Sequence, residues 1–407
     1  MSGPLDGVRV LDLTSVVMGP MATQILGDLG ADVITVESFR GDTNRSMGPG
    51  PSRQLSDVSL NLLRNKRNVA LDLKHPDGRA ALLRIVATCD VFVTNLRPLP
   101  LGRLELDYDT IAGVRPDIIF CQAQGFPSDG GRANEPAYDD IIQGAAGVPD
   151  VVRRAGADPA LLPTLLADKV SGLVLTYAIL AALYHRAVTG QGQHIELPMV
   201  DALTSFLLVE HSSGAVTGSE RSGAGYRRIL TPHRSPKRTR DGWIVVFPYL
   251  QAHWEALLRA GGADDLIDDP RLSHLGRQSD PGFGYATLER VLATRTTADW
   301  LSYCGEGGIP ATAVGNVDEL VASLPDEQHP VIGAYKSIPS PVRFSATPAT
   351  VRRHAPFIGQ HNHEVLAEVG YDAEEVARLE AVGALRRSRV HPTPGASPGS
   401  PDAGDRH

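Results

Sequence analysis

The first part of the chain alternates between short apolar runs and helical patterns. Residues 7–13 form an apolar run and residues 21–29 follow a helical pattern. Gly30 ends that pattern before a second apolar run over 31–37. A strand, a helix and a strand at this spacing predict a βαβ unit, with parallel strands joined by a right-handed crossover.

The same alternation continues to about residue 125. It predicts further strands over 68–73, 91–94 and 118–122, and a helix over 76–89. We therefore expect an α/β fold whose large domain is an open, Rossmann-like parallel sheet. Ligands in such sheets bind outside the carboxyl ends of the strands.

Patterning in the rest of the chain predicts several separate parts. A long apolar helix over 168–188 precedes a strand over 193–197. The predicted parts are a large domain over 1–212, a Gly/Ser/Arg-rich linker over 213–240, a small α+β domain over 241–325, a closing segment over 326–387 and a disordered tail over 388–407. Later elements are predicted as a strand over 243–247, an extended segment over 338–344, and helices over 200–212, 251–260, 286–292, 364–369 and 373–381.

Composition and charge narrow the class of protein. Of the 407 residues, 42% are hydrophobic and 21% charged, and the formal net charge is −8. An acidic chain of this kind argues against nucleic acid as a partner. The longest apolar segment, 173–183, is too short to cross a bilayer, and the N-terminus lacks a signal-peptide pattern, so no membrane partner is expected. Three widely separated cysteines, Cys89, Cys121 and Cys304, are expected to be reduced thiols in a cytoplasmic protein.

Common nucleotide and metal motifs are missing from the places where they would carry function. The first βα turn contains Gly19-Pro20 instead of G-x-G-x-x-G, and no G-x-x-x-x-G-K-[ST], H-E-x-x-H or C-x-x-C occurs. We therefore predict no metal site. An α/β sheet without such motifs leaves the function open.

One carboxylate has a position that suits chemistry. Asp168 begins the long apolar helix, in the sequence Leu-Leu-Ala-Asp-Lys-Val-Ser-Gly. The N–H groups and dipole of a helix N-terminus stabilise a negative charge. A simple helix-capping acid is the alternative interpretation of the same residue.

Three stretches of the sequence resemble the family III CoA transferases. This group includes formyl-CoA transferase and carnitine CoA-transferase and is related to α-methylacyl-CoA racemase. The stretches are 4–34, with Pro-Leu-Asp-Gly-Val-Arg-Val-Leu-Asp-Leu-Thr, then 167–193, with Ala-Asp-Lys-Val-Ser-Gly and Thr-Gly-Gln-Gly-Gln, and 341–366, with Pro-Val-Arg-Phe-Ser and Gly-Gln-His-Asn-His-Glu. The match is continuous from residue 4 to about 200 and weaker from 225 to 385.

The resemblance implies that Asp168 is a covalent nucleophile. It implies transfer of CoA from an acyl-CoA to a carboxylic acid through an aspartyl-CoA thioester, with CoA as substrate and no permanently bound cofactor. Asp139 matches an acidic residue of the family and is expected to shape the site around Asp168. A solvated helix-start acid is the alternative for Asp139.

The resemblance also implies a CoA site along the carboxyl ends of the large-domain strands. Lys74, Arg97 and Arg103 would meet phosphates there, although each is otherwise a solvated cation. Ser38 occupies the position of a family arginine, and Arg40 is a candidate substitute. The predicted CoA-binding residues are Val17, Met18, Arg40, Leu71, Asp72, Leu73, Lys74, Asn95, Leu96, Arg97, Arg103 and Tyr138.

Two other functions stay open at this point. The racemase relatives place a histidine base where this chain has Tyr138, and a tyrosine is a poor base at neutral pH because its pKa is near 10. A racemase is therefore the first alternative. A catalytically silent CoA-binding protein is the second, and the presence of Asp168 argues against it.

The resemblance further implies an assembly. It predicts an interlocked homodimer, with the small domain inserted in the chain and 326–387 returning to the large domain. The acid that accepts or donates CoA is not specified. The basic run Arg227-Arg228 and the segment 233–238 could hold an acidic acyl group, and a solvated loop is the alternative.

Overall fold

The chain divides into two compact units. The structure is a computed structural model that describes residues 3–218 and 223–387. Unit 1 contains the described parts of Met1–Ile142, Thr164–Leu203 and Leu324–His407. Unit 2 contains those of Gln143–Pro163 and Thr204–Ser323. The predicted tail over 388–407 lies outside the described residues.

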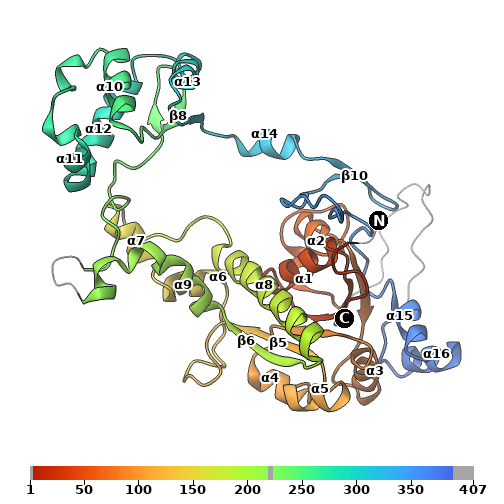
Figure 1. Cartoon of the computed structure of the whole chain (residues 1–407). Helices are drawn as coiled ribbons and strands as arrows, with labels where there is room; N and C mark the ends of the chain where they lie inside the picture. The colour runs from red at the N-terminus through yellow and green to blue at the C-terminus, as the bar shows by residue number, and fades with distance from the viewer. Residues whose placement is uncertain (1–2, 219–222, 388–407) are drawn as a thin grey trace. The chain divides into compact units, whose positions relative to one another are not determined.

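Unit 1 is built on a six-stranded sheet in which every neighbouring pair of strands is parallel (Figure 1). The strand order is β3-β2-β1-β4-β5-β6. This confirms the predicted open α/β sheet. The strands are β1 (Arg9–Leu13), β2 (Asp32–Glu37), β3 (Lys66–Ala70), β4 (Val91–Thr94), β5 (Ile119–Gln124) and β6 (Gln193–Pro198).

Helices cover both faces of this sheet. On one face, α1 (Met18–Asp28) packs against α8 (Leu166–Thr189), and α8 also contacts β5 and β6. On the other face, α3 (Pro76–Val86) packs against α5 (Tyr108–Val114) and α15 (Asn362–Glu368) around a core that includes Phe92 and Phe120. The remaining elements of unit 1 are η1 (Thr43–Ser46), α2 (Asp57–Leu62), α4 (Pro98–Arg103), the start of α6 (Asp139–Ala145), the start of α9 (Met199–His211), α16 (Ala373–Ala381) and the hairpin of β10 (Asp326–His329) and β11 (Gly333–Lys336).

The third strand is displaced from its predicted position. We expected residues 68–73, but β3 is Lys66–Ala70, so the strand begins with two cations. Both cations are buried and paired: the Lys66 ammonium is 2.9 Å from the Asp12 carboxylate, and Arg67 binds Asp32 and Glu368. Apolar patterning could not reveal this strand start, because the partners of Lys66 and Arg67 are distant in sequence.

Helix α8 is longer than the apolar segment at its centre. With 24 residues it is long and apolar enough, by length and composition, to cross a membrane, although we expected the segment 173–183 to be too short. Half of its most apolar window is buried inside the protein, however, where it packs on α1 and the sheet. A helix buried in a protein core therefore meets the same criteria of length and composition as a membrane-spanning helix.

Unit 2 has its own core. A three-stranded antiparallel sheet packs with helices around the buried indole of Trp300. The predicted helix over 251–260 is confirmed, whereas the one over 286–292 begins earlier, at Pro281. The elements of unit 2 are the end of α6, α7 (Val148–Arg154), the end of α9 (Met199–His211), η2 (Ser213–Thr217), β7 (Lys237–Arg238), β8 (Trp243–Val246), α10 (Gln251–Ala260), η3 (Asp264–Leu266), η4 (Pro270–Leu272), α11 (His274–Ser279), α12 (Pro281–Leu292), α13 (Thr297–Glu306), β9 (Ala311–Ala313) and α14 (Val317–Ala322).

Candidate active site

A cavity of about 280 Å³ lies in unit 1 where the strand order reverses between β1 and β4. Such a switch point is where open α/β sheets bind ligands, because the loops on either side diverge there. The cavity is lined after β1 by Ser15, Val16 and Met18, after β4 by Asn95, Leu96, Arg97 and Pro100, after β5 by Ala123, Gln124 and Gly125, and elsewhere by Thr43, Glu135, Pro136, Ala137, Tyr138, Asp168 and Met199.

Asp168 enters this cavity from the first turn of α8. Its side chain does not cap the helix: Leu165 is the N-cap residue, and no side chain makes a cap hydrogen bond there. The residue is only 7% exposed, and in the described part of the chain its carboxylate has no hydrogen-bond or ion-pair partner. Since an unpartnered carboxylate is costly to bury, this arrangement is unusual for a purely structural acid.

Asp139 lies against Asp168. The backbone N–H of Asp168 donates to Asp139 Oδ1 over 3.1 Å, which joins the starts of α6 and α8. Burial, and then the negative charge of Asp139, raises the pKa of Asp168 to about 6. A carboxylate with a raised pKa is more basic and, when ionised, more nucleophilic than an ordinary aspartate.

The motif around Asp168 has a packing reason. A Cβ atom on Gly172 would lie 2.9 Å from the carbonyl oxygen of Met18, at the start of α1. Glycine therefore allows α8 to cross α1 closely, which brings Asp168 to the loop that follows β1. A larger residue at 172 would move these two helices apart.

The loop after β1 is held in a strained conformation. Val16, a β-branched residue, has a φ of +70°, in the left-handed region that favours glycine. Asp42 Oδ1 accepts a hydrogen bond from the Val16 N–H over 3.0 Å. The Asn95 amide bonds both the N–H and the carbonyl of Ser15, over 3.0 and 2.9 Å. The side chains of Asp42 and Asn95, which come from other loops, thus hold the loop after β1 in place at the cavity wall.

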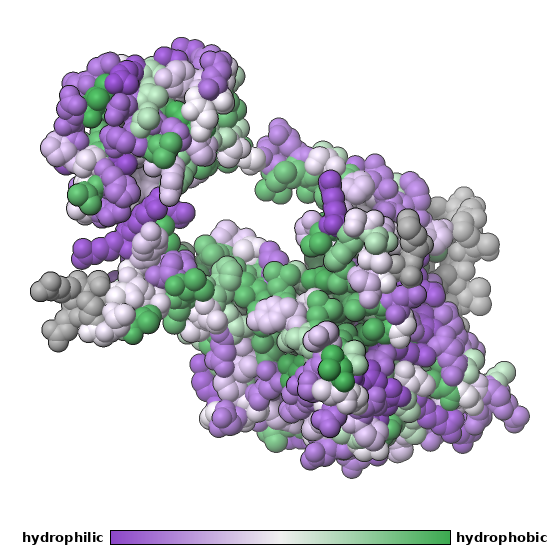
Figure 2. Space-filling view, viewed as in Figure 1, coloured by the Kyte–Doolittle hydropathy of each residue, from purple (hydrophilic) through white to green (hydrophobic). Residues whose placement is uncertain are grey.

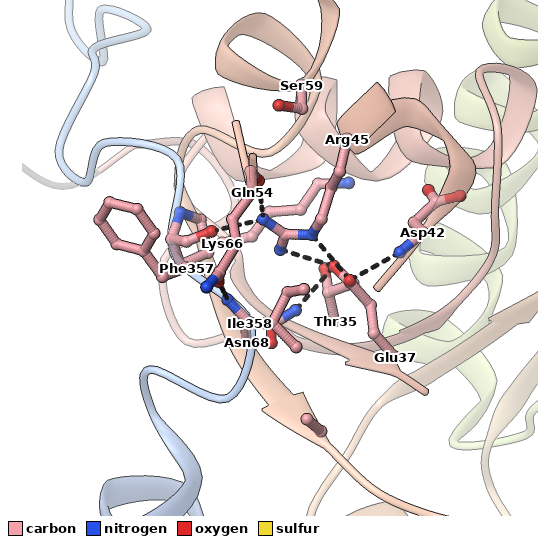
Figure 3. Close-up of polar contacts among 12 residues, drawn as sticks. Thr35, Glu37, Asp42, Arg45, Gln54, Ser59, Lys66, Asn68, Phe357 and Ile358 are labelled. Carbon is pink, nitrogen blue, oxygen red and sulfur yellow. Dashed lines mark hydrogen bonds and ion pairs between the residues drawn. The ribbon is translucent and has the colours of Figure 1, made fainter. Parts of the chain in front are cut away.

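A buried polar cluster positions Asp42 in turn. Figure 3 shows the Arg45 guanidinium facing the Glu37 carboxylate, with bonds of 2.8 and 2.7 Å, while the Asp42 N–H donates to the same carboxylate over 2.9 Å. Arg45 also binds the carbonyl of Pro356, which ties the C-terminal segment to this corner. Burial, with a contribution from the charge of Glu37, raises the pKa of Asp42 to about 6.

Only some of the predicted CoA-binding residues meet at the cavity. Met18, Asn95, Leu96, Arg97 and Tyr138 line it together with Asp168, and Val17 is buried beside Met18. The Arg97 guanidinium donates to the carbonyl of Asn134. The other predicted residues are not among the cavity-lining residues that the structure describes: Arg40, Lys74 and Arg103 are exposed, Leu71 is buried, and Asp72 and Leu73 are half-buried.

Sequence reasoning missed several residues of this site. Asp42 was not singled out, although Gly-Asp-Thr-Asn after a strand is typical of a capped turn, and Asp42 does cap η1 by accepting from the Asn44 N–H. Ser15, Val16 and Gln124 were also missed. No sequence signal marks Val16, because valine rarely adopts a positive φ.

Asn95 offers a test of whether its two hydrogen bonds to Ser15 hold the loop after β1 in place. Asn95→Ala removes both hydrogen bonds to Ser15, so we expect the free energy of unfolding to fall by about 1–2 kcal/mol and the KM for acyl-CoA to rise about tenfold. Asn95→Asp keeps the acceptor for the Ser15 N–H and should give intermediate values. Steady-state kinetics measures the KM, and urea unfolding measures the free energy of unfolding. A wild-type KM in the alanine variant would contradict a role of Asn95 in holding this loop.

The raised pKa of Asp168 predicts a pH dependence. Protonation removes the nucleophile, so kcat/KM should fall about tenfold per pH unit below about pH 6. Asp139→Asn removes the neighbouring charge and keeps an oxygen acceptor for the Asp168 N–H. We expect this variant to move the acid limb to lower pH, whereas Asp140→Asn, at an exposed neighbour, leaves it in place. An unchanged or higher midpoint in Asp139→Asn would refute the coupling.

The fold and the cavity describe an α/β enzyme with a buried carboxylate as its candidate reacting group. Comparison with known proteins identifies the family. The model of CoA-transferase family III matches residues 5–362. The chain is 31% identical over 399 residues to the succinyl-CoA:glutarate CoA-transferase of Mus musculus, covering 94% of this chain and 91% of that protein.

Two further comparisons agree. The chain is 33% identical over 326 residues to the acetyl-CoA:oxalate CoA-transferase of Acetobacter aceti, covering 79% of this chain and 83% of that protein. A solved CAIB/BAIF family protein of Brucella suis is 27% identical, with a TM-score of 0.77 over 91% of this chain and all of that chain (100%). The protein belongs to CoA-transferase family III, which confirms the resemblance, and its activity is CoA transfer.

Proposed function

We propose that the protein transfers CoA from an acyl-CoA to a carboxylic acid through a covalent thioester on Asp168. The observation that supports this most is the buried carboxylate of Asp168 at the switch-point cavity, which has no side-chain partner among the described residues and whose pKa is raised to about 6. A capping or ion-paired aspartate would have its charge satisfied by the fold. Here the carboxylate is left available for an electrophile.

The proposed reaction has four steps. The Asp168 carboxylate attacks the thioester carbonyl, the C–S bond breaks, and a mixed anhydride and CoA thiolate form. The thiolate attacks the aspartyl carbonyl carbon and expels the donor acid as its carboxylate. The acceptor carboxylate then attacks the aspartyl thioester, and the released thiolate attacks the acceptor acyl carbon. Asp168 leaves as a carboxylate, so no net proton or electron is exchanged.

The residues around the cavity have supporting roles in this proposal. Met18, Asn95 and Leu96 contact the bound thioester, and Arg97 lies where it can meet the polar part of CoA. No resident cofactor takes part, because each step uses only a carboxylate and a thiolate. Tyr138, 66% exposed, stands where the racemase relatives place a base, and nothing in the site favours racemisation.

Trapping tests the covalent intermediate. Hydroxylamine should convert an aspartyl-CoA thioester into a hydroxamate with release of CoA, so protein mixed with an acyl-CoA and hydroxylamine should carry a modified Asp168 by peptide mass spectrometry. A matched sample without acyl-CoA controls for non-enzymatic modification. Active transfer without any adduct at Asp168 would contradict the proposal, and binding without transfer would indicate a silent protein.

We further propose that the protein is a cytoplasmic, interlocked homodimer, with unit 2 as the small inserted domain. Support for the homodimer comes from one exposed face of α8. That face carries Leu173, Tyr177, Tyr184 and Val188, which are 53, 63, 75 and 67% exposed. These positions recur at helical spacing along a single stripe. Figure 2 shows hydrophobic side chains gathered where α8 runs. Contiguous apolar surface of this kind is typical of a protein–protein interface.

The stripe gives a direct test of assembly. Tyr177→Asp introduces a charge at the centre of the apolar face, and we expect it to weaken dimerisation by at least about tenfold in analytical ultracentrifugation. Glu374→Lys changes a charge on the exposed surface of α16 and serves as the control. An unaltered association constant in the Tyr177 variant would exclude this face from the interface.

A further inference from the structure

A second, larger cavity lies entirely within unit 2. Its volume is about 1040 Å³, and residues of α10, α11 and α12, labelled in Figure 1, contribute to its lining. Its walls are mainly aromatic and apolar, and include Phe247, Trp254, Tyr285 and Leu288. This size and character suit an organic ligand.

The lining is strongly basic. Four arginines, Arg154, Arg227, Arg228 and Arg277, line the cavity, and no aspartate or glutamate is among the described residues that do so. The charge of Arg154 is met by Asp150 at 2.6 Å. Within residues 3–218 and 223–387, the other three arginines have no carboxylate within ion-pair distance. Among the described residues, no carboxylate therefore offsets the positive charge of Arg227, Arg228 and Arg277 in this cavity.

Two of these arginines are held in place by neutral groups. Arg277 donates to the carbonyl of Leu272 and to Gln251 Oε1, and its guanidinium lies 4.8 Å from the centre of the Trp254 ring. The Arg228 guanidinium lies 5.0 Å from the Phe247 ring. Burial, and then the positive charge of Arg228, lowers the pKa of Arg277. Bringing these cations together is unfavourable, and a bound anion would offset the repulsion.

One wall residue of the cavity, Trp254, has a buried indole donor. The residue is 6% exposed, and its indole Nε1 is buried without a hydrogen-bond partner among the described residues. A buried donor left unpaired costs about 1–3 kcal/mol. The other buried tryptophan, Trp300, donates to the carbonyl of Leu292. An acceptor oxygen that reached this nitrogen on binding would remove this cost.

We propose that the unit 2 cavity binds an organic acid, with its carboxylate at Arg228 and Arg277 and its apolar body against the aromatic walls. A carboxylate matches the planar donor fork of arginine and brings acceptor oxygens. The aromatic walls favour a body of ring size over a short diacid. The identification of this acid as a substrate of the transferase rests on the proposed function. The basic residues noted in the sequence therefore have different environments. Arg227 and Arg228 line the cavity, whereas Lys237 is buried and pairs with Glu289 at 3.7 Å.

The experiment uses tryptophan fluorescence and calorimetry on the full chain, with 3-phenylpropanoate as the probe. We expect saturable binding that 3-phenylpropanamide, its neutral amide, does not reproduce. Arg228→Gln with Arg277→Gln should weaken binding at least tenfold, and Trp254→Phe should weaken it by a smaller factor while keeping the ring. The control is Arg290→Gln, an exposed arginine of α12 outside the lining, which should bind as the wild type does.

Three outcomes would overturn the proposal. The first is equal binding of the amide, and the second is wild-type binding in the double arginine variant. The third is that 3′-phosphoadenosine 5′-diphosphate binds at the same arginines more tightly than 3-phenylpropanoate and displaces it. The last would assign the cavity to the nucleotide end of CoA. Circular dichroism and the unfolding midpoint of each variant exclude loss of fold as the cause.

The two proposals fail separately. Binding of the probe is measured in Asp168→Asn as well, where covalent transfer is removed. Loss of transfer with retained binding tests only Asp168, and retained transfer without probe binding overturns only the unit 2 site.

Discussion

Asp168→Asn is expected to reduce CoA transfer by at least about 10⁴-fold while leaving the folded protein as stable as the wild type or more so. Asparagine keeps the size of the side chain but cannot form the mixed anhydride. The loss should appear in kcat/KM, because no later step proceeds without the first covalent bond. Transfer assays with a panel of acyl-CoA donors and acids measure it.

The stability of this variant distinguishes a lost nucleophile from a lost fold. The pKa of Asp168 is raised to about 6, so its ionised form disfavours the folded state, and this penalty grows as pH rises from about 4 to about 6. Asparagine carries no charge, so we expect a gain on the order of 2 kcal/mol at pH 7.5 and almost none at pH 4. Urea unfolding at both values measures the difference.

Asp140→Asn, at the exposed neighbour of Asp139, is the matched control and should change neither activity nor stability. Substantial transfer by Asp168→Asn would remove Asp168 from the role of nucleophile. Inactivity with a large loss of stability would point instead to a structural role for the carboxylate.

The second large effect is expected at Lys66. Its ammonium is fully buried and contacts Asp12 Oδ2, the Pro20 carbonyl and Thr23 Oγ1 at 2.9, 2.9 and 2.7 Å. Lys66→Met leaves the Asp12 carboxylate buried without its cation, which should lower the free energy of unfolding by about 3–5 kcal/mol. Chemical denaturation monitored by circular dichroism measures this loss.

A double variant separates the ion pair from packing. Asp12→Leu combined with Lys66→Met removes both charges, so it should recover most of the stability lost in the single variant. Lys169→Met, at an exposed lysine, should change stability by less than about 0.5 kcal/mol. A single variant as stable as the wild type would mean that Asp12 and Lys66 contribute little to the centre of the sheet.

Local patterning was sufficient for much of the fold. The helices predicted over 251–260 and 373–381 agree with α10 and α16, and the strand predicted over 91–94 agrees with β4. These elements follow ordinary periodicity and end at clear local signals. The third strand was predicted over 68–73, but its start at Lys66 was missed because its two cations are buried against carboxylates distant in sequence, Asp12, Asp32 and Glu368.

The sequence by itself therefore determined the alternation of strands and helices, the place of Asp168 at the start of a long helix, and the family resemblance. These depend on neighbours along the chain. Only the tertiary structure decided that the Asp168 carboxylate would be buried against Asp139, that Asp42 and Asn95 would hydrogen-bond Val16 and Ser15, and that Arg228 and Arg277 would share a cavity. Burial and charge pairing join residues far apart in sequence, so no local pattern encodes them.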